Sequence, residues 1–214
     1  MGTRLLIAGA TGLVGAKVLE LALQEPRVDR VIAVVRRPLA EHSKLEQWLG
    51  PDLLKALKET RPNAVICCLG TTIDKEKGDK QAFIHVDQEL VLGLARWASG
   101  PAMRFCVISS LGANSRSMVF YNRVKGTVED ALKGMEFEAL HVFQPSILDG
   151  PRSEVRTGER IGLVLMRVIA PLLPPKVRPM RHDVLAKALV NAALGTDKGA
   201  HVHTFKKIFE LASR

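Results

Sequence analysis

Apolar residues along this chain form short continuous runs that alternate with stretches of helical periodicity. A run without polar interruption is typical of a strand buried on both faces of a sheet, whereas apolar residues three or four positions apart form one face of a helix. The apolar runs predict strands at residues 5–8, 31–35, 64–69, 105–109 and 140–143, with 201–205 as a late edge strand.

Helical periodicity fills most of the intervals between these strands. The first helix follows residue 12 and ends near Glu25, and its face is formed by Val14, Val18, Leu21 and Ala22. Further helices are expected at residues 45–59, 87–98, 121–133 and 182–194. No convincing strand is evident between Arg37 and Pro62, so one strand of the expected sheet is short or degraded.

Alternating strands and helices predict an α/β fold, a Rossmann-type doubly wound parallel sheet with helical crossovers. The length of 214 residues suits one domain, residues 1–214, and no repeat or linker divides it. We expect residues 149–181 to form a small C-terminal elaboration that shapes a substrate pocket. Within it, residues 161–173 predict a buried helix, with a substrate lid or a homodimer contact as alternatives.

Composition narrows the class of protein further. Hydrophobic residues make up 47% of the chain and charged residues 25%, as in ordinary globular domains. No apolar stretch is long enough to span a bilayer. Cys67, Cys68 and Cys106 lie in apolar runs, which predicts buried free thiols in a reducing compartment, and we expect a cytoplasmic protein. Adjacent cysteines lack metal-ligand spacing, so no metal is expected.

The formal net charge is +9, which favours anionic partners. Lysine and arginine are nevertheless scattered, without a dense basic block or aromatic interleaving, so nucleic-acid binding is not favoured. The N-terminus resembles a secretory signal only superficially, because glycines interrupt its apolar run and Lys17 follows. Leu6 stands where a myristoylation motif requires serine or threonine.

A glycine triplet between the first strand and the first helix carries the earliest functional signal. The segment reads G-A-T-G-L-V-G, and glycines there allow a sharp turn and close approach to a dinucleotide pyrophosphate at the helix N-terminus. The alternative is a tight turn without a ligand, since a glycine triplet alone is weak evidence. The candidate cofactor-binding residues are Gly9, Thr11, Gly12, Leu13, Val14 and Gly15.

The ends of the next strands suggest which dinucleotide is bound, because ligands of such sheets lie at the carboxyl ends of strands. Arg36 and Arg37 end the second strand, where an acidic residue would bind the ribose of NAD. Arginine instead accommodates the 2′-phosphate of NADP, so NADP(H) is favoured over NAD, with a surface arginine pair as the alternative. The small turn Leu69, Gly70, Thr71 offers backbone close to the cofactor.

Four further side chains predict the chemistry. Ser109 and Ser110 end a strand, and Tyr121 and Lys125 follow at a spacing that places both on one helix face. A cation beside a phenol favours the phenolate, and the phenol can then exchange a proton with a carbonyl or alcohol. A serine hydroxyl would hold the substrate oxygen. An accidental Tyr–Lys pair is the alternative, although Tyr121 is the single tyrosine of the chain.

Together these motifs resemble the short-chain dehydrogenase/reductase superfamily in its atypical or extended branch, and more narrowly the Tat-interacting oxidoreductase family with its bacterial relatives. The matching segments are 9–15, 67–72, 82–87, 109–113 and 120–126. The resemblance implies an NADPH site and a tyrosine that donates or accepts a proton, with Lys125 orienting the ribose. It also implies that Leu148 and Arg156 cover the cofactor. Gln144 departs from the pattern, because relatives usually carry arginine before the proline.

The remaining polar residues receive ordinary interpretations. The histidines form no triad with a serine, and His201 and His203 alternate as on a surface strand. The acidic loop with Asp74, Glu76 and Asp79 is expected to be solvated, with closure over a substrate as the alternative. Beside an NADP-dependent oxidoreductase of a small-molecule substrate, two hypotheses stay open: an NADPH-binding regulatory protein with little turnover, and a polyanion-binding protein.

Overall fold

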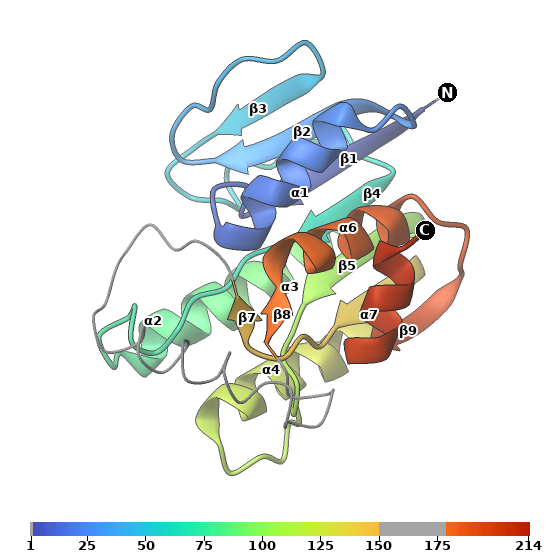
Figure 1. Cartoon of the computed structure of the whole chain (residues 1–214). Coiled ribbons are helices and arrows are strands. Elements are labelled where there is room, and N and C mark those ends of the chain that lie inside the picture. Colours follow the sequence, from blue (N-terminus) through green and yellow to red (C-terminus); the bar gives the residue numbers. More distant parts are fainter. Residues whose placement is uncertain (1, 150–178) are drawn as a thin grey trace.

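The computed structural model of the chain describes residues 2–149 and 179–214. Over these residues, seven strands form one sheet whose neighbouring strands are all parallel (Figure 1). Their order is β3-β2-β1-β4-β5-β6-β9. The bounds are β1 (Thr3–Ala8), β2 (Val28–Val35), β3 (Leu45–Leu49), β4 (Ala64–Cys67), β5 (Gly100–Ile108), β6 (Phe137–Phe143) and β9 (Gly199–His203). Two short strands, β7 (Leu148–Asp149) and β8 (Met180–Arg181), pair separately.

Helices cover both faces of the sheet, which confirms the predicted Rossmann-type doubly wound fold. One face carries α1 (Leu13–Gln24), α6 (His182–Ala193) and α7 (Phe205–Ala212). The opposite face carries α3 (Leu90–Ala98) and α4 (Phe120–Lys133). A short helix α2 (Lys80–Ile84) and a π-helical turn η1 (His85–Glu89) lead directly into α3.

Each central strand supplies both hydrophobic cores because its side chains alternate between the two faces. In β1, Leu5 and Ile7 pack beneath α1 and α6, whereas Leu6 and Ala8 face α3. All four side chains are fully buried. This explains why β1 reads as an uninterrupted apolar run. The strand order reverses beside β1, between β2 and β4, which opens the crevice where such sheets bind ligands.

The helix expected at residues 45–59 is wrong. Residues Leu45–Leu49 form β3 and pair with β2, and only turns follow until residue 57. Trp48 decides the outcome, because its 1% exposed side chain completes the core around β2 and α3, where it meets Trp97 edge-on. Glu46 and Gln47, near the centre of β3, have weak intrinsic strand propensity. The sequence therefore contains no local indication that this segment pairs with β2.

The helical segment expected to begin at residue 87 begins seven residues earlier, at Lys80. Asp79 is its N-cap, and the carboxylate accepts hydrogen bonds from the backbone N–H groups of Gln81 and Ala82. Glu76 likewise accepts a hydrogen bond from the Thr71 hydroxyl. The carboxylates of Glu76 and Asp79 therefore make hydrogen bonds within the protein, which corrects the expectation that the acidic loop is simply solvated.

The C-terminal part differs from expectation in two ways. The last strand ends at His203, and Phe205 instead begins α7, a helix that the sequence interpretation missed. His203 is also buried, not on the surface, because its ring stacks on that of His141 in β6. Residues 150–178, which include Arg156, the predicted helix 161–173 and most of the predicted pocket segment 149–181, lie outside the described part of the chain.

Candidate active site

The glycine turn after β1 brings backbone atoms closer together than side chains would allow. Gly9 has a φ of +82°, and a Cβ there would lie 2.7 Å from the Cys68 carbonyl oxygen. A Cβ on Gly15 would collide with the Gly9 carbonyl oxygen, so this glycine lets α1 pack tightly against the turn. Two of the three glycines are therefore required by the geometry of the strand–turn–helix unit.

The amino end of α1 suits a bound anion. Gly12 is its N-cap, no side chain caps the helix, and no acidic residue stands in the first turn. Backbone N–H groups at a helix start attract phosphate through partial positive charge. Thr11 and Gly12 are exposed and Leu13 is half-buried, whereas the Val14 side chain packs into the core. Val14 could therefore contact a bound anion only through its backbone N–H group.

Arg36 and Arg37 follow the last residue of β2, the strand next to β1, and both side chains are exposed. Within the described residues neither guanidinium forms an ion pair or hydrogen bond. Two unengaged arginines at this strand end, beside the glycine turn, leave planar donors available for an anionic ligand.

The turn after β4 meets a buried ion pair. Asp87 in η1 lies 2.7 Å, oxygen to nitrogen, from the Lys125 ammonium group, and its other oxygen accepts a hydrogen bond from the Thr71 backbone N–H, also at 2.7 Å. The side chains of Asp87 and Lys125 are 0% and 6% exposed. A Cβ on Gly70 would lie 3.4 Å from that carboxylate and 3.8 Å from the ammonium nitrogen, so the turn passes directly over the pair.

Lys125 keeps its charge in this buried position. Burial opposes the charged form, but the neighbouring Asp87 carboxylate and Tyr121 more than offset it, so the pKa of Lys125 is raised. Lys125 also donates to the Ile108 carbonyl oxygen at the end of β5. Tyr121 stands one helical turn earlier in α4, half-buried, with its ring 5.5 Å from that of Phe83. Its hydroxyl has no hydrogen-bond partner among the described residues.

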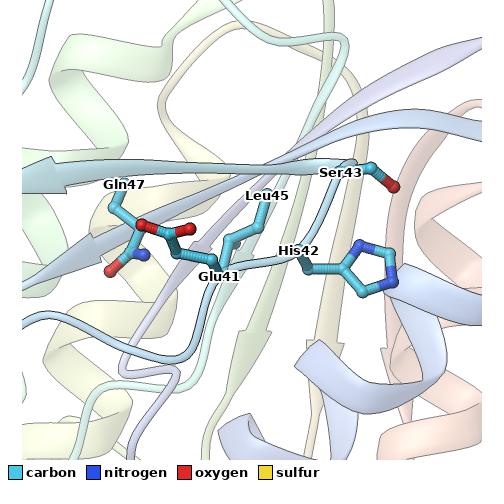
Figure 2. A pocket seen from close by; sticks show the side chains of 5 residues that line it. All are labelled: Glu41, His42, Ser43, Leu45 and Gln47. Atoms are coloured by element: carbon cyan, nitrogen blue, oxygen red, sulfur yellow. The ribbon is translucent and has the colours of Figure 1, made fainter.

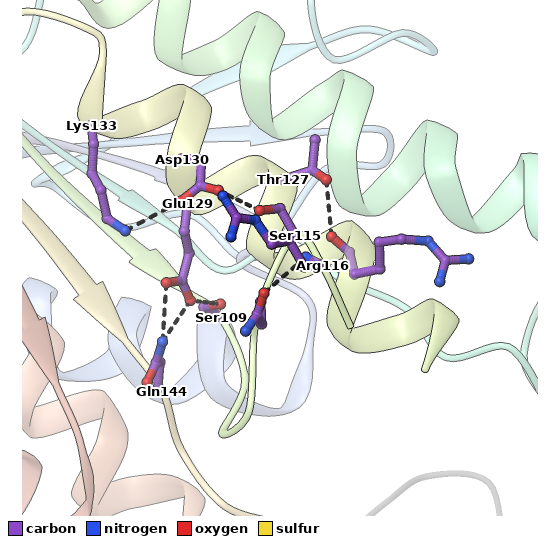
Figure 3. A network of polar contacts seen from close by, with 10 residues as sticks. Ser109, Ser115, Arg116, Thr127, Glu129, Asp130, Lys133 and Gln144 are labelled. Carbon is purple, nitrogen blue, oxygen red and sulfur yellow. Dashed lines mark hydrogen bonds and ion pairs between the residues drawn. The ribbon is translucent and has the colours of Figure 1, made fainter. Parts of the chain in front are cut away.

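The two candidate serines point to different partners. Ser109 is buried, and its hydroxyl donates to the carboxylate of Glu129 in α4, as Figure 3 shows. Gln144, the residue that departs from the family pattern, donates its amide N–H to both oxygens of the same carboxylate at 2.9 and 3.0 Å. Ser110 is half-buried and makes only a weak contact of 3.4 Å with the Leu111 carbonyl oxygen.

One face of α4 thus carries the polar residues that meet the sheet, at positions 121, 125 and 129. Sequence reasoning identified Tyr121 and Lys125 but missed Asp87 and Glu129. Asp87 ends a segment that supports the family resemblance, and Glu129 lies at helical spacing from Lys125, but neither position indicates that its carboxylate is buried. Gly126 supports this packing, because a Cβ there would collide with the backbone of Asn114 and Ser115.

Two other features concern the predicted cofactor cover and the pocket in Figure 2. Leu148 lies in β7 and is half-buried. An open hollow of about 530 Å³ is lined by the residues in Figure 2: Glu41, His42, Ser43, Leu45 and Gln47. It adjoins Leu45, the residue that begins β3, whereas the glycine turn and Arg36 adjoin the carboxyl ends of parallel strands. The hollow is therefore not part of the candidate active site.

Comparison with known proteins decides the family. A model of the NAD dependent epimerase/dehydratase family matches residues 5–118, which include the glycine turn, β1 to β5 and η1. The chain belongs to this family. It is accordingly a short-chain dehydrogenase/reductase-type protein with an NAD(P)-dependent, oxidoreductase-like function, as its motifs predicted.

Two relatives are similar in sequence over most of this chain. The protein fmp52, mitochondrial, from Aspergillus fumigatus is 31% identical over 206 residues, covering 88% of this chain and 86% of its own length. The protein HTATIP2 from Rattus norvegicus is 32% identical over 161 residues, covering 72% and 66%. The second match agrees with the narrower resemblance to the Tat-interacting oxidoreductase family.

Among solved structures, the Bordetella bronchiseptica enzyme WbmH in complex with NAD+ superimposes with a TM-score of 0.66 at 18% identity, covering 99% of this chain and 79% of that one. At this identity the likeness establishes the fold.

The predicted cytoplasmic location is contradicted by the names of the family members, because several fungal relatives are named as mitochondrial. Three free thiols indicate only that the chain does not depend on disulfides, and they do not discriminate between reducing compartments. Among the described residues, no helix combines the length and apolar character needed to cross a bilayer.

Proposed function

We propose that this protein is an NADP(H)-dependent oxidoreductase that interconverts a small carbonyl compound and its alcohol, with Tyr121 as proton donor and acceptor. The observation that carries the proposal is the placement of Tyr121 and the charged Lys125 on one face of α4, against the turn at Gly70. Membership of an NAD-dependent family supports a dinucleotide at this crevice.

The residues present fit a dinucleotide. Gly9 and Gly15 let the turn and α1 pack closely against the end of β1, and the start of α1 has no side-chain cap and no acidic residue. The Gly12 N–H already donates to the Gly9 carbonyl oxygen, so we assign the pyrophosphate to the backbone N–H groups of Leu13 and Val14 and the ribose near the nicotinamide to Lys125. When bound, NADP(H) would supply or accept the hydride.

Tyr121 performs the proton transfer in this proposal. In reduction its hydroxyl gives a proton to the substrate oxygen, and in oxidation the phenolate takes the proton back. Lys125, which keeps its positive charge one helical turn from Tyr121, is assigned to orient the ribose beside the tyrosine. We assign the hydroxyl that holds the substrate oxygen to Ser110, since the Ser109 hydroxyl is already engaged by Glu129. The substrate pocket is assigned to the region of residues 149–181.

A cofactor titration tests the choice of dinucleotide. We expect NADPH to bind more tightly than NADH, because Arg36 and Arg37 supply charge-assisted hydrogen bonds to a 2′-phosphate. Arg36→Ala should weaken NADPH binding roughly tenfold to a hundredfold and leave NADH binding unchanged. Arg30→Ala, an exposed arginine near the start of β2, is the matched control. Equal affinities that Arg36→Ala does not alter would refute the NADP assignment.

Turnover tests the chemistry. Tyr121→Phe removes only the hydroxyl and retains the ring against Phe83, so NADPH affinity should stay within about twofold while kcat falls at least about a hundredfold. Retention of wild-type kcat would exclude Tyr121 as the proton donor. A broad substrate panel without turnover, together with a large NADPH-induced rise in melting temperature, would instead favour a regulatory NADPH-binding protein.

A further inference from the structure

The proton transfer assigned to Tyr121 leaves one buried charge unused, the carboxylate of Asp87. It is a side chain with no exposed area, and it joins three segments that are distant in sequence. Its own position lies in the π-helical turn η1, one oxygen contacts Lys125 of α4, and the other binds the Thr71 N–H in the turn after β4. A π-helical turn inside a helical segment often marks a functional position.

Stability alone is a weak explanation for this arrangement. Removing two charges from water costs several kcal/mol, and a well-packed apolar pair at the same place is often as stable or more so. The Asp87 Oδ1 atom faces the ammonium at 2.7 Å but has no hydrogen bond of good geometry within the described residues. The carboxylate is thus held mainly as a counter-charge to Lys125.

We propose that Asp87 is a positioning residue, which keeps Lys125 charged and holds its ammonium group beside Tyr121 and the Gly70–Thr71 turn. Its effect on turnover rests on the proposed function. Its effect on the charge of Lys125 is a property of the protein without any ligand, so the two can fail separately.

The groups that face Lys125 show why Asp87 matters most. They are Asp87 from η1, Tyr121 from its own helix and the Cys67 thiol from β4. Burial raises the pKa of Cys67 to about 11, so this thiol is uncharged near neutral pH. Asp87 is then the single full negative charge among these three groups. Without it, burial of the ammonium group would be opposed mainly by Tyr121, and the pKa of Lys125 would be lower.

Titration of the lysine provides the direct test. In protein labelled with isotopic lysine, the Lys125 signal is assigned by its loss in Lys125→Met and followed by NMR from pH 6 to pH 11. Asp87→Asn retains an oxygen for the Thr71 N–H but removes the charge, and we expect the Lys125 titration to move at least about one pH unit lower. Glu89→Gln, an exposed carboxylate in the same turn that pairs with His85, should leave the titration unchanged. An unmoved titration in Asp87→Asn would overturn the proposal.

A double-mutant cycle then measures the effect on the site. Asp87→Asn should lower kcat at least about tenfold in the wild-type background but by less than about twofold in the Lys125→Met background, because its effect passes through the lysine. Equal losses in both backgrounds would show that Asp87 only anchors the Thr71 turn, which contradicts the proposal.

Two further outcomes are also decisive. If Asp87→Asn does not fold, the Asp87→Asn/Lys125→Met variant should fold, because it no longer buries an unpaired ammonium. Failure of both variants to fold would refute the role assigned to the pair. If the wild-type protein binds no dinucleotide, the proposed function fails, and the lysine titration still decides whether Asp87 sets the charge of Lys125.

Discussion

The two adjacent serines show how much the role of a side chain depends on its partner. Ser109 and Ser110 are equivalent in the sequence, but the Ser109 hydroxyl is engaged by Glu129 while that of Ser110 is nearly unengaged. Side chains alternate along an extended backbone, so neighbours at a strand end face different surroundings. A role in binding the substrate oxygen therefore belongs to Ser110 in the proposed mechanism.

Alanine substitutions separate the two serines. Ser110→Ala should lower kcat at least about tenfold with little change in stability. Ser109→Ala deprives the buried Glu129 carboxylate of a donor and should cost about 1–3 kcal/mol of unfolding free energy, with kcat nearly unchanged. Chemical denaturation and steady-state kinetics on both variants measure these effects. The reverse assignment, with kcat lost in Ser109→Ala alone, would place the catalytic hydroxyl at Ser109.

These residues also show what could be read from the sequence. The glycine turn and the Tyr121–Lys125 spacing are local signals, because their geometry is set within one strand–turn–helix unit or one helical turn. Asp87 and Glu129 acquire their surroundings from contacts across 38 and 20 residues, with Lys125 and Ser109 respectively. An acidic residue in a helical pattern normally indicates an exposed face, so burial of these two carboxylates was not evident before the fold was known.

Among the elements, the helical segment from Lys80 to Ala98 is the one whose position matters most for the site, since it carries Asp87. Its start is fixed by Asp79, the N-cap. Asp79→Ala should destabilise the protein by about 1 kcal/mol, because two backbone N–H groups lose their acceptor. Asp74→Ala in the preceding exposed loop is the control, expected within about 0.5 kcal/mol of wild type. Equal stabilities of the two variants by urea denaturation would contradict the capping role.

The central strands were predictable, whereas the two edge strands differ: β9 was predicted at residues 201–205 and β3 was missed. The apolar runs of β1, β2 and β4 follow from burial on both faces, whereas β3 has a neighbour on one side only and contains Glu46 and Gln47. Gln47 nevertheless has a structural role, because its side-chain amide accepts a hydrogen bond from the Leu39 N–H and donates one to the Leu39 carbonyl oxygen. Such a contact stabilises the loop after Arg37 and leaves no local signature in the sequence.

For the molecule as a whole, the middle of the sheet and its β9 edge serve different purposes. The crevice beside β1 collects the glycine turn, Arg36 and the Lys125–Asp87 pair, which are the residues assigned to binding and chemistry. The edge of the sheet where β9 joins β6 contains a stack of histidine rings, with His141 and His203 in hydrogen-bond contact at 2.9 Å. Both rings are buried, so this edge links the stability of the sheet to pH.

The histidine pair predicts a loss of stability on acidification. Burial, together with neighbouring histidines, lowers the pKa of His141 and of His203 to about 4, from an ordinary value of 6.5. Above pH 6.5 both rings are neutral in the folded and the unfolded chain, and the stabilising effect is complete. Between pH 6.5 and pH 4 the unfolded chain binds more protons, so stability falls as pH falls, by roughly 3 kcal/mol for each ring at most.

Urea denaturation at pH 7.0, 6.0 and 5.0 measures this slope before most carboxylates titrate. The double variant His141→Leu/His203→Leu should show a flatter dependence, because an apolar pair of similar volume has no proton to bind. His42→Gln, an exposed histidine, should retain the wild-type slope. The charges of Lys207 and Arg214 also lower the pKa of His203 in the folded protein. Lys207→Gln should raise this pKa toward its ordinary value, so the stability lost between pH 7.0 and pH 5.0 should be smaller than in the wild-type protein. A wild-type protein whose stability is the same at pH 7.0 and pH 5.0 would show that the pair does not bind fewer protons in the folded state.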